Sequence, residues 1–509
     1  MLSTTYYPLS APGGEVGARC NVPLQTIEIS PHCDTVTAFQ RLLGGHPRHL
    51  FFLDSALRQH GLSRYSLLGC KPFLVLKSKG TNITVEDVTG VPQEREGNPF
   101  EVLRSYLRTF SVGATRWVAP GESEVALPPI CRAGVAVGYL GYGLHHFLER
   151  LPKNAIDDLE FPDMYFGFYD KFVVYDHKEG RCFLVGRNLE DGLREFNALL
   201  CAPGVGATRL VAPTKGKRCQ VKGNFTKREY LEAVRQAKEY IVRGDIYQVN
   251  LSQRFQTELD CAPHELYLRL REINPAPFSA YLQFGDNVII SSSPERFLKV
   301  EAVAPQASRR VQTCPIKGTR PRGIDPSSDQ RLMEELLHST KDNAELTMIV
   351  DLERNDLGKV CNYGSVKVLE KKRLEAHPTV FHLVATVGGD LYPKYDLVDL
   401  LKATFPGGSV TGAPKIRAME IIDELEPTSR SVYTGAIGYI GLDGSMDLAI
   451  AIRTFLIKGH SASFQAGGGI VADSRPEEEY QETLFKSRAL VESLVGGGPA
   501  TYGYRGQDA

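Results

Sequence analysis

The chain contains the segment CPIKGTRPRG at residues 314–323, where two prolines and two glycines accompany four polar side chains. Proline fixes φ and glycine permits backbone conformations that other residues avoid, so the segment has a defined local shape. Lys317 stands between the apolar Ile316 and the permissive Gly318, a setting that can hold its amine out of bulk water. Taken alone, such a segment is more typical of a surface turn with solvated cations. A catalytic role for Lys317 therefore depends on the residues that the rest of the chain brings to it.

The composition of the whole chain excludes several classes of protein. The 509 residues carry 59 Lys+Arg against 60 Asp+Glu without a basic stripe of interleaved aromatic residues, so we expect no nucleic-acid partner. The ten cysteines form no CxxC pair, which predicts reduced thiols without a disulfide framework or a structural zinc site. No apolar run approaches the ~20 residues that span a bilayer, and the N-terminus lacks a signal-peptide pattern. We expect a soluble, cytoplasmic protein that does not bind membranes.

The length predicts about three domains or one large two-part fold. Residues 1–20 are small and polar and predict a loose N-terminal arm, and residues 498–509 predict a tail. The segment 201–218 is rich in Ala, Pro, Gly and Thr, which is typical of a linker. These boundaries leave an N-terminal region at 21–200 and a C-terminal domain at 219–497.

The N-terminal region mixes short strands and helices. Alternating and buried apolar runs predict strands at 24–29, 49–55 and 64–69, and helical periodicity predicts helices at 35–43 and 100–110. The strand at 49–55 ends in Asp54 and Ser55, which either bind a ligand or cap the following turn.

Two further N-terminal segments are predicted to join a sheet. The glycine-rich run 133–143 lacks a G-x-G-x-x-G pattern, and its strand-like spacing indicates sheet with close backbone packing instead of a dinucleotide loop. Residues 164–176 and 181–185 predict the strands of a hairpin.

The C-terminal domain begins with a helix predicted over 226–243, where Thr226 and Glu229 form a capping box. The following strand, 246–252, presents two faces. Its apolar face carries Tyr247, Val249 and Leu251, and its polar face carries Gln248, Asn250 and Ser252. Uncharged amides and a hydroxyl on one face indicate either a polar cleft or a solvent-facing edge.

Candidate residues for proton transfer and anion binding lie in or next to buried strands. Glu295 follows the β-run 287–293, where burial can raise its pKa and suit it to proton transfer; pairing with Arg296 is the alternative. Residues 449–455 predict a buried strand that carries one cation, Arg453. A buried cation needs an anionic partner, so Arg453 favours a binding function.

Two helices carry acid pairs at i,i+3 spacing, which places each pair on one face. Asp342 and Glu345 form the first pair, and Glu479 and Glu482 form the second, with Lys486 one turn further on. Two such pairs facing each other would supply the oxygen ligands that Mg²⁺ prefers, although a single acid pair is ordinarily a solvated face. The glycine-rich segment 407–415 is not a P-loop, because Ala-Pro stands where Walker A requires Lys-Ser/Thr.

Together these segments resemble the chorismate-utilising enzymes. The resemblance runs in order through nearly all of residues 225–495. It rests on GDIYQVNL (244–251), SSPERF (292–297), PIKGTRPRG (315–323), KDNAEL (341–346), IVDLERNDLG (349–358), FPGGSVTGAPK (405–415), AIAIRTF (449–455) and GGGIVADSRPEEEYQET (467–483). The N-terminal FFLDS (51–55), RYSLLG (64–69) and VGYLGYG (137–143) resemble the extra region of the aminating members, apart from Gly143, where the pattern has Asp.

The resemblance implies an α/β fold of the α+β type, with large antiparallel sheets packed between outer helices around a cleft for magnesium and chorismate. It implies that Glu345 and Glu482 bind Mg²⁺ directly, with Asp342 and Glu479 acting through water. The chorismate carboxylates are expected on Tyr433, Arg453, Lys486 and the backbone of Gly467, Gly468 and Gly469. Glu295 is expected to be the general acid for loss of the 4-hydroxyl, with His382 and Thr319 lining the site.

Two positions distinguish the branches of this family. Gln248 stands where water-adding members carry a lysine base, and an amide cannot deprotonate water, which disfavours isochorismate or salicylate synthesis. Lys317 stands where anthranilate synthases typically carry alanine, and the sequence PIKGT is similar to that of the aminodeoxychorismate-forming branch. There the lysine amine attacks C2 of chorismate and ammonia enters at C4. Anthranilate synthesis is the alternative.

The resemblance also implies partners. The chain lacks a glutaminase cysteine in a G-x-C-x-G context, so ammonia is expected from a separate glutamine amidotransferase subunit. Asp54 and Ser55 resemble part of a tryptophan pocket, which predicts tryptophan as a further ligand.

Overall fold

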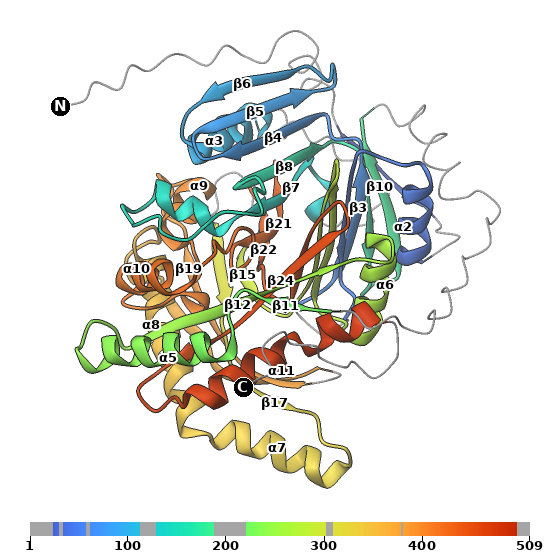
Figure 1. Ribbon diagram of the computed structural model, residues 1–509. Coiled ribbons are helices and arrows are strands. Elements are labelled where there is room, and N and C mark those ends of the chain that lie inside the picture. The colour runs from blue at the N-terminus through green and yellow to red at the C-terminus, as the bar shows by residue number, and fades with distance from the viewer. Residues whose placement is uncertain are drawn as a thin grey trace.

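The computed structural model describes residues 24–29, 34–57, 62–111, 129–187, 220–301, 309–377 and 380–495. Within these ranges the chain forms two large antiparallel sheets that face each other, with helices on their outer faces (Figure 1). The predicted fold class, antiparallel sheets packed between outer helices, is confirmed. The predicted arm at 1–20, linker at 201–218 and tail at 498–509 lie outside the described residues.

The first sheet joins strands from distant parts of the chain. Its order is β1 (Gln25–Ile29), β10 (Arg181–Gly186), β9 (Phe172–Asp176), β3 (Tyr65–Cys70), β2 (His49–Asp54), β13 (Phe278–Phe284), β14 (Asn287–Ser293), β23 (Thr454–Lys458), β24 (Ser461–Ile470), β12 (Gln248–Glu258) and β11 (Lys222–Gly223), with β20 (Gly412–Ala413) also paired to β12. The N-terminal β2 pairs directly with the C-terminal β13, with Phe52 opposite Tyr281. Both halves of the chain therefore build this sheet.

The second sheet is assembled in the same way. Its order is β17 (Ile316–Pro321), β19 (Val380–Asp390), β16 (Arg310–Cys314), β15 (Arg296–Val300), β22 (Met446–Ile450), β21 (Ala436–Gly441), β7 (Val135–Leu140), β8 (Met164–Tyr169), β4 (Leu74–Lys79), β5 (Asn82–Asp87) and β6 (Pro92–Glu96), with β18 (Lys367–Ala376) also paired to β19. The two halves meet at β7 and β21, where Gly138 lies opposite Gly438. A Cβ on Gly138 would lie 1.8 Å from the Tyr165 carbonyl oxygen, which confirms the close backbone packing predicted for 133–143.

Three apolar layers hold these elements together. Side chains of both sheets, such as Phe51 and Val137, fill the space between them. The outer face of the first sheet packs against α2 (Thr35–Gly44), α6 (Pro263–Ile273) and α11 (Pro476–Val495). The outer face of the second sheet packs against α3 (Pro99–Ser111), α7 (Pro326–His338), α8 (Thr340–Gly358) and α9 (Leu397–Thr404). A further cluster joins β12 to α5 (Lys227–Val242) and α10 (Lys415–Leu425).

Sequence signals at helix ends are confirmed. The Thr226 hydroxyl accepts the Glu229 N–H at 3.3 Å, and Oε2 of Glu229 accepts the Thr226 N–H at 2.7 Å, so the predicted capping box starts α5. The predicted helices at 35–43 and 100–110 correspond to α2 and α3.

Three strand predictions are wrong in detail. Residues 164–176 do not form one strand, because the chain passes from β8 in one sheet to β9 in the other; the predicted hairpin is formed by β9 and β10, with Asp176 opposite Arg181. Residues 449–455 likewise divide between β22 and β23, with Arg453 at a φ of 50° between them. Apolar periodicity does not reveal where a buried chain changes sheets. Tyr247 precedes β12 and is 74% exposed, so it does not share the buried face of Val249 and Leu251.

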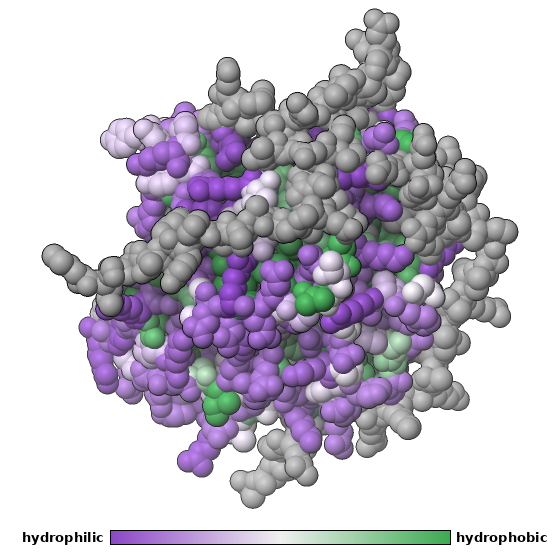
Figure 2. Space-filling model, turned by 90° about the horizontal axis from the view of Figure 1, so that it is seen from above, coloured by the Kyte–Doolittle hydropathy of each residue, from purple (hydrophilic) through white to green (hydrophobic). Residues whose placement is uncertain are grey.

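Seen from above, the described surface is mostly hydrophilic, with small separate hydrophobic groups (Figure 2). Among the described residues, no helix combines the length and apolarity needed to cross a bilayer.

Candidate active site

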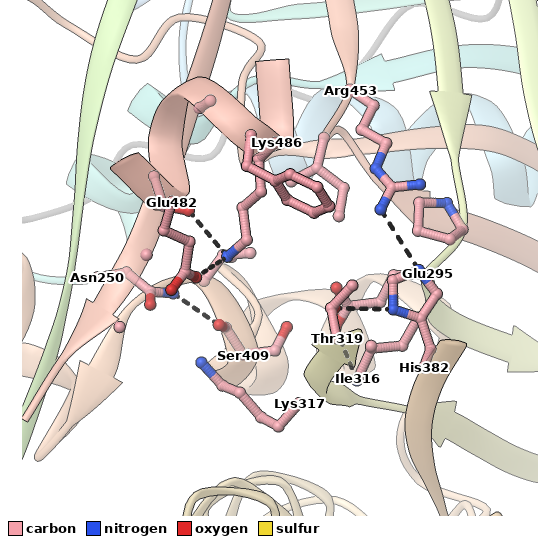
Figure 3. Close-up of a pocket in the computed structure, with 18 of the residues that line it drawn as sticks. Asn250, Glu295, Ile316, Lys317, Thr319, His382, Ser409, Arg453, Glu482 and Lys486 are labelled. Atoms are coloured by element: carbon pink, nitrogen blue, oxygen red, sulfur yellow. Dashed lines mark hydrogen bonds and ion pairs between the residues drawn. The ribbon is translucent and has the colours of Figure 1, made fainter. Parts of the chain in front are cut away.

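A pocket of about 390 Å³ collects most of the residues singled out in the sequence (Figure 3). Its lining comes from both sheets and from α8, α11 and the 3-10 turn η4 (Gly408–Val410). The predicted residues that line it are Glu295, Lys317, Thr319, Asp342, Glu345, His382, Tyr433, Arg453, Gly467, Gly468, Gly469, Glu482 and Lys486. Gln248 and Glu479 do not line it. Segments almost 200 residues apart in sequence thus form one site.

Lys317 reaches this pocket because β17 bulges at Gly318. The pairing of β17 with β19 shifts between Ile316 and Thr319, and Gly318 has a φ of 81°. A Cβ on Gly318 would lie 2.8 Å from Leu336 and 3.0 Å from Asp342, so only glycine lets the strand approach α7 and α8 this closely. The bulge places the Lys317 side chain in the pocket (Figure 3).

The Lys317 amine has no hydrogen-bond or ion-pair partner among the described residues (Figure 3). Burial lowers its pKa; Glu345 opposes this shift, and the nearby Lys486 reinforces it. A lowered pKa increases the fraction of neutral amine, which is the nucleophilic form. The surface-turn alternative does not hold for this lysine.

Glu295 is buried between β14 and β15 and is 4% exposed. Burial raises the pKa of its carboxyl, against smaller lowering effects from Ser409, the Ile316 N–H and Lys317. Its Oε1 accepts the Ile316 N–H at 3.3 Å, which fixes the carboxyl next to the bulged segment. Arg296 instead pairs with Asp447, its Nε lying 2.9 Å from Oδ1. A fixed carboxyl that favours its protonated form suits a general acid.

His382 links two other predicted residues. Its Nδ1 lies 3.0 Å from the Thr319 hydroxyl across the β17–β19 ladder, and its Nε2 lies 3.3 Å from Nη2 of Arg453. Burial, reinforced by the Arg453 charge, lowers the pKa of His382 well below its usual value, so the imidazole is neutral. A neutral imidazole has one donor nitrogen and one acceptor nitrogen, so His382 can donate or accept a hydrogen bond without adding charge to the pocket.

Arg453 lines the pocket without a carboxylate partner among the described residues. Burial lowers its pKa to about 10, with Glu295 acting in the opposite direction. Its φ of 50° turns the chain between the two sheets and directs the guanidinium inward. A desolvated guanidinium without a counter-ion is costly unless a ligand supplies the anion, so the site fits a carboxylate ligand.

The three consecutive glycines of β24 present bare backbone to the pocket. A Cβ on Gly467 would lie 2.5 Å from the Leu251 carbonyl oxygen, and a Cβ on Gly469 would lie 2.2 Å from Nε2 of Gln248. Side chains are therefore excluded at these positions by the neighbouring strand β12. Lys486 from α11 crosses this backbone, donating to the Gly467 carbonyl at 3.1 Å.

The polar face of β12 faces a cleft and not open solvent. Asn250 and Ser252 line the pocket. Gln248 is completely buried behind Gly469, and its amide has no hydrogen-bond partner among the described residues. Gln248, the residue on this face that was predicted to bind substrate, is thus the one of the three that does not line the pocket.

The two acid pairs approach the pocket from α8 and α11. Burial raises the pKa of both Glu345 and Glu479. Oε1 of Glu479 accepts the Ser474 hydroxyl at 2.6 Å, while its Oε2 is buried without a partner. A Cβ on Gly468 would lie 3.2 Å from oxygens of both Glu479 and Glu482, so glycine leaves room for these carboxylates. An all-oxygen set with an unsatisfied buried oxygen fits a magnesium ion.

Cationic side chains hold these carboxylates in the present arrangement. Lys486 lies 2.5 Å from Glu482, and Arg320 lies 3.0 Å from Asp342. Among the described residues, no three His, Cys, Asp or Glu side chains are gathered closely enough to bind a metal as they stand. In this arrangement Lys486 engages one of the two carboxylate oxygens of Glu482.

Sequence reasoning missed residues on the loop before α10. Ser409 lines the pocket, and its carbonyl accepts Nδ2 of Asn250 at 2.6 Å. Arg430 is buried, pairs with Glu426 at 2.7 Å and donates to the Val410 carbonyl at 2.9 Å. The sequence FPGGSVTGAPK (405–415) excludes a P-loop and contributes to the family resemblance, and the polar strand face that includes Asn250 was the signal for a contact with this loop.

Glu353 is a second buried acid near Glu295. Its Oε2 accepts the Thr313 hydroxyl at 2.8 Å. Burial raises its pKa to about 8, supported by the charges of Glu295 and Asp356 and opposed by Thr313 and Lys415. The folded protein therefore holds a proton that the unfolded chain, with an ordinary pKa of 4.5, releases earlier as the pH rises.

We predict that this proton makes the protein less stable as the pH rises from 4.5 to about 8, because the folded state binds more protons in that window. Glu353→Gln keeps a neutral side chain of similar shape and removes the titration. The variant's melting temperature should exceed that of the wild type by a margin that grows between about pH 5.5 and 8.5. Thermal unfolding at both pH values tests this, and a margin independent of pH would contradict it.

A second cavity, of about 790 Å³, lies between the sheets and is lined by Asp54 and Ser55. Oδ2 of Asp54 accepts the Tyr267 hydroxyl at 3.0 Å and Nε of Arg271 at 2.5 Å. The Ser55 hydroxyl donates to the Tyr65 carbonyl at 2.7 Å. Both residues thus fix the end of β2 and form part of the cavity wall.

Comparisons with known proteins agree with this geometry. The family model for chorismate binding enzymes matches residues 86–492. The chain is 37% identical over 465 residues to aminodeoxychorismate synthase component 1 of Bacillus subtilis (strain 168), covering 90% of this chain and 93% of that protein. It is 40% identical over 468 residues to anthranilate synthase component 1 of Thermus thermophilus, covering 90% and 95%.

A solved structure shows the same fold. The crystal structure of anthranilate synthase component I from Streptococcus pneumoniae TIGR4 matches with a TM-score of 0.71 and 32% identity, covering 91% of this chain and 99% of that one. The family match spans the pocket, and relatives of both kinds match nearly end to end. The chain belongs to the chorismate binding enzyme family and is a chorismate-utilising enzyme.

Proposed function

We propose that the protein is an aminodeoxychorismate synthase component that converts chorismate and ammonia to 4-amino-4-deoxychorismate in the cytoplasm. The observation that carries this proposal is Lys317, an amine inside the pocket without a partner among the described residues and with a lowered pKa. An anthranilate synthase needs no nucleophile at this position. The names of the relatives from Bacillus subtilis and Salmonella typhimurium, at 37% and 43% identity, support the same branch.

In the proposed reaction, the Lys317 amine attacks C2 of chorismate while the C4–O bond breaks. Glu295 gives its proton to the departing 4-hydroxyl, so that water leaves and a carboxylate remains. Ammonia then forms a bond to C4, the C2–N bond breaks, and Lys317 regains its electron pair as an amine. Arg453, Tyr433, Lys486 and the Gly467–Gly469 backbone hold the two substrate carboxylates, with Thr319 and His382 beside the reacting ring.

We propose Mg²⁺ as the cofactor. Glu345 and Glu482 would hold it directly, and Asp342 and Glu479 would act through water. When bound, the ion supplies positive charge that neutralises a substrate carboxylate. The acids' own role is to bind and orient this charge.

Ammonia is proposed to come from a glutamine amidotransferase partner. The relatives are named as component 1, which implies a second component in those enzymes. The alternative for this chain is anthranilate synthesis, which the 40% identity to the Thermus thermophilus protein favours.

One assay separates the two products. Purified protein is mixed with chorismate, magnesium and an ammonium salt, with and without added aminodeoxychorismate lyase. The proposal expects p-aminobenzoate only when lyase is present. Fluorescent anthranilate formed without lyase would reject the proposal in favour of the alternative.

We propose tryptophan as the ligand of the cavity that contains Asp54 and Ser55. A volume of about 790 Å³ with an aromatic wall at Phe278 and Tyr439 suits an indole ring. Tryptophan should bind in calorimetry and raise the melting temperature, because it stabilises only the folded state. Ser55→Phe, which places a ring in the cavity, should remove both effects. Equal binding by that variant would place tryptophan elsewhere.

A further inference from the structure

Ser409 is a buried hydroxyl in the pocket that no described residue satisfies. It stands in η4 and is 6% exposed, and it lines the pocket near Asn250 and Lys317 (Figure 3). Its hydroxyl lies close enough to the Glu295 carboxyl to lower the pKa of that acid. Yet its Oγ makes no hydrogen bond of acceptable geometry within the described part of the chain. Buried polar atoms without partners are rare in folded proteins and require an explanation.

The loop that carries Ser409 is tied down through its main chain. Asn250 holds the Ser409 carbonyl with its side chain and the Thr411 carbonyl with its own N–H, at 2.6 and 2.8 Å. Lys415 donates to the Thr404 and Pro406 carbonyls at 2.9 and 2.8 Å. These carbonyls of the loop therefore accept hydrogen bonds from fixed donors. The loop is held in place, and the Ser409 hydroxyl can form a hydrogen bond with a ligand.

Neighbouring hydroxyls behave differently. The Thr411 hydroxyl, on the same loop and completely buried, donates to the Gly407 carbonyl at 3.0 Å. The Ser293 hydroxyl, two residues before Glu295, donates to the Ile450 carbonyl at 2.7 Å. Of these three, only the hydroxyl of Ser409 both lines the pocket and lacks a partner. A ligand oxygen that lies beside Glu295 can therefore serve as its hydrogen-bond partner.

We propose that Ser409 is a catalytic residue whose hydroxyl contacts the departing 4-oxygen of chorismate together with the carboxyl of Glu295. The proton still comes from Glu295, the C4–O bond breaks, and water leaves. Ser409 keeps its own proton and donates a hydrogen bond to the oxygen as negative charge grows on it. This inference rests on the role of Glu295 in the proposed function.

The test compares Ser409→Ala with the wild type on chorismate consumption, whichever product forms. Loss of a hydrogen bond to a charged transition state should lower kcat by about 10- to 100-fold. The affinity for chorismate, measured by calorimetry with magnesium, should change by no more than about threefold, because the bond strengthens only as the oxygen departs. Thr411→Val is the matched control: it removes the bound hydroxyl of the same loop and should lower the melting temperature with little change in kcat.

A kcat for Ser409→Ala within about twofold of the wild type would overturn the proposal and leave Ser409 bonded to water. An equal loss in Thr411→Val would also overturn it, because the effect would then belong to the loop. If the alanine variant does not fold, Ser409→Cys, with a weaker donor of similar shape, should show the loss, and full activity would overturn the proposal. A product other than 4-amino-4-deoxychorismate in the wild type would reject the proposed function without affecting this comparison.

Discussion

Lys317→Ala should reduce product formation on the order of 1,000-fold or more while chorismate still binds. The amine has no partner among the described residues, so its removal leaves no severed ion pair in the pocket. The groups expected to hold the substrate carboxylates, Arg453 and the β24 backbone, come from other strands and remain in place. Turnover and calorimetric binding of chorismate are measured on the same preparation.

Lys317→Arg separates nucleophilic from electrostatic roles. Arginine keeps the positive charge, but its guanidinium remains protonated and cannot act as a nucleophile. We expect this variant to be as inactive as the alanine variant. Activity restored by arginine, or unchanged in alanine, would remove Lys317 as the nucleophile.

The nucleophile can also be observed directly. In the proposed reaction, wild-type protein with chorismate but without ammonia stops after the first step. A peptide that contains Lys317 should then carry the mass of chorismate less one water. The same adduct should be missing from Lys317→Ala.

Glu482→Gln should lower activity by at least about 10- to 100-fold and raise the magnesium concentration needed for half-maximal activity. The Glu482 carboxylate lines the pocket, lies 2.5 Å from Lys486 and has its pKa lowered chiefly by that lysine. An amide of the same shape keeps one oxygen but loses the charge that would bind the ion. Activity is titrated with magnesium at saturating chorismate.

Glu478→Gln is the matched control on the same helix. Glu478 is exposed and pairs with Arg475 at 3.0 Å, away from the pocket lining. Exposed pairs contribute little to stability, so this variant should titrate like the wild type. A normal magnesium titration for Glu482→Gln would reject Glu482 as a metal ligand.

Many of the residues that line the pocket could be predicted, because they belong to short sequence patterns that indicate their arrangement. The i,i+3 acid pairs of α8 and α11 fix which faces the carboxylates share, and the glycines around Lys317 and in β24 mark places where backbone must approach closely. These signals depend on a few neighbouring residues. Their interpretation therefore does not depend on contacts with distant parts of the chain.

The parts that were wrong or missed depend on distant partners. Residues 449–455 form one apolar run, yet a positive φ at Arg453 sends the two halves to different sheets. Gln248 and Asn250 share a strand face, yet Asn250 lines the pocket while Gln248 packs against Gly469 of the neighbouring strand; the role predicted for Gln248 stays a prediction. Ser409 lies in the motif FPGGSVTGAPK (405–415), but its contact with the pocket depends on Asn250, more than a hundred residues earlier, whose side chain holds the Ser409 carbonyl.

The shared sheets have a consequence for how the chain folds. β2 and β7 leave the ribosome long before β13 and β21, the strands with which they pair. Until those partners are made, the early strands have open edges, which favour association between chains. Contacts this distant in sequence also slow folding, since a long loop must close before any pairing stabilises it. We therefore expect efficient folding in cells to depend on chaperones that protect the first half while the second is synthesised.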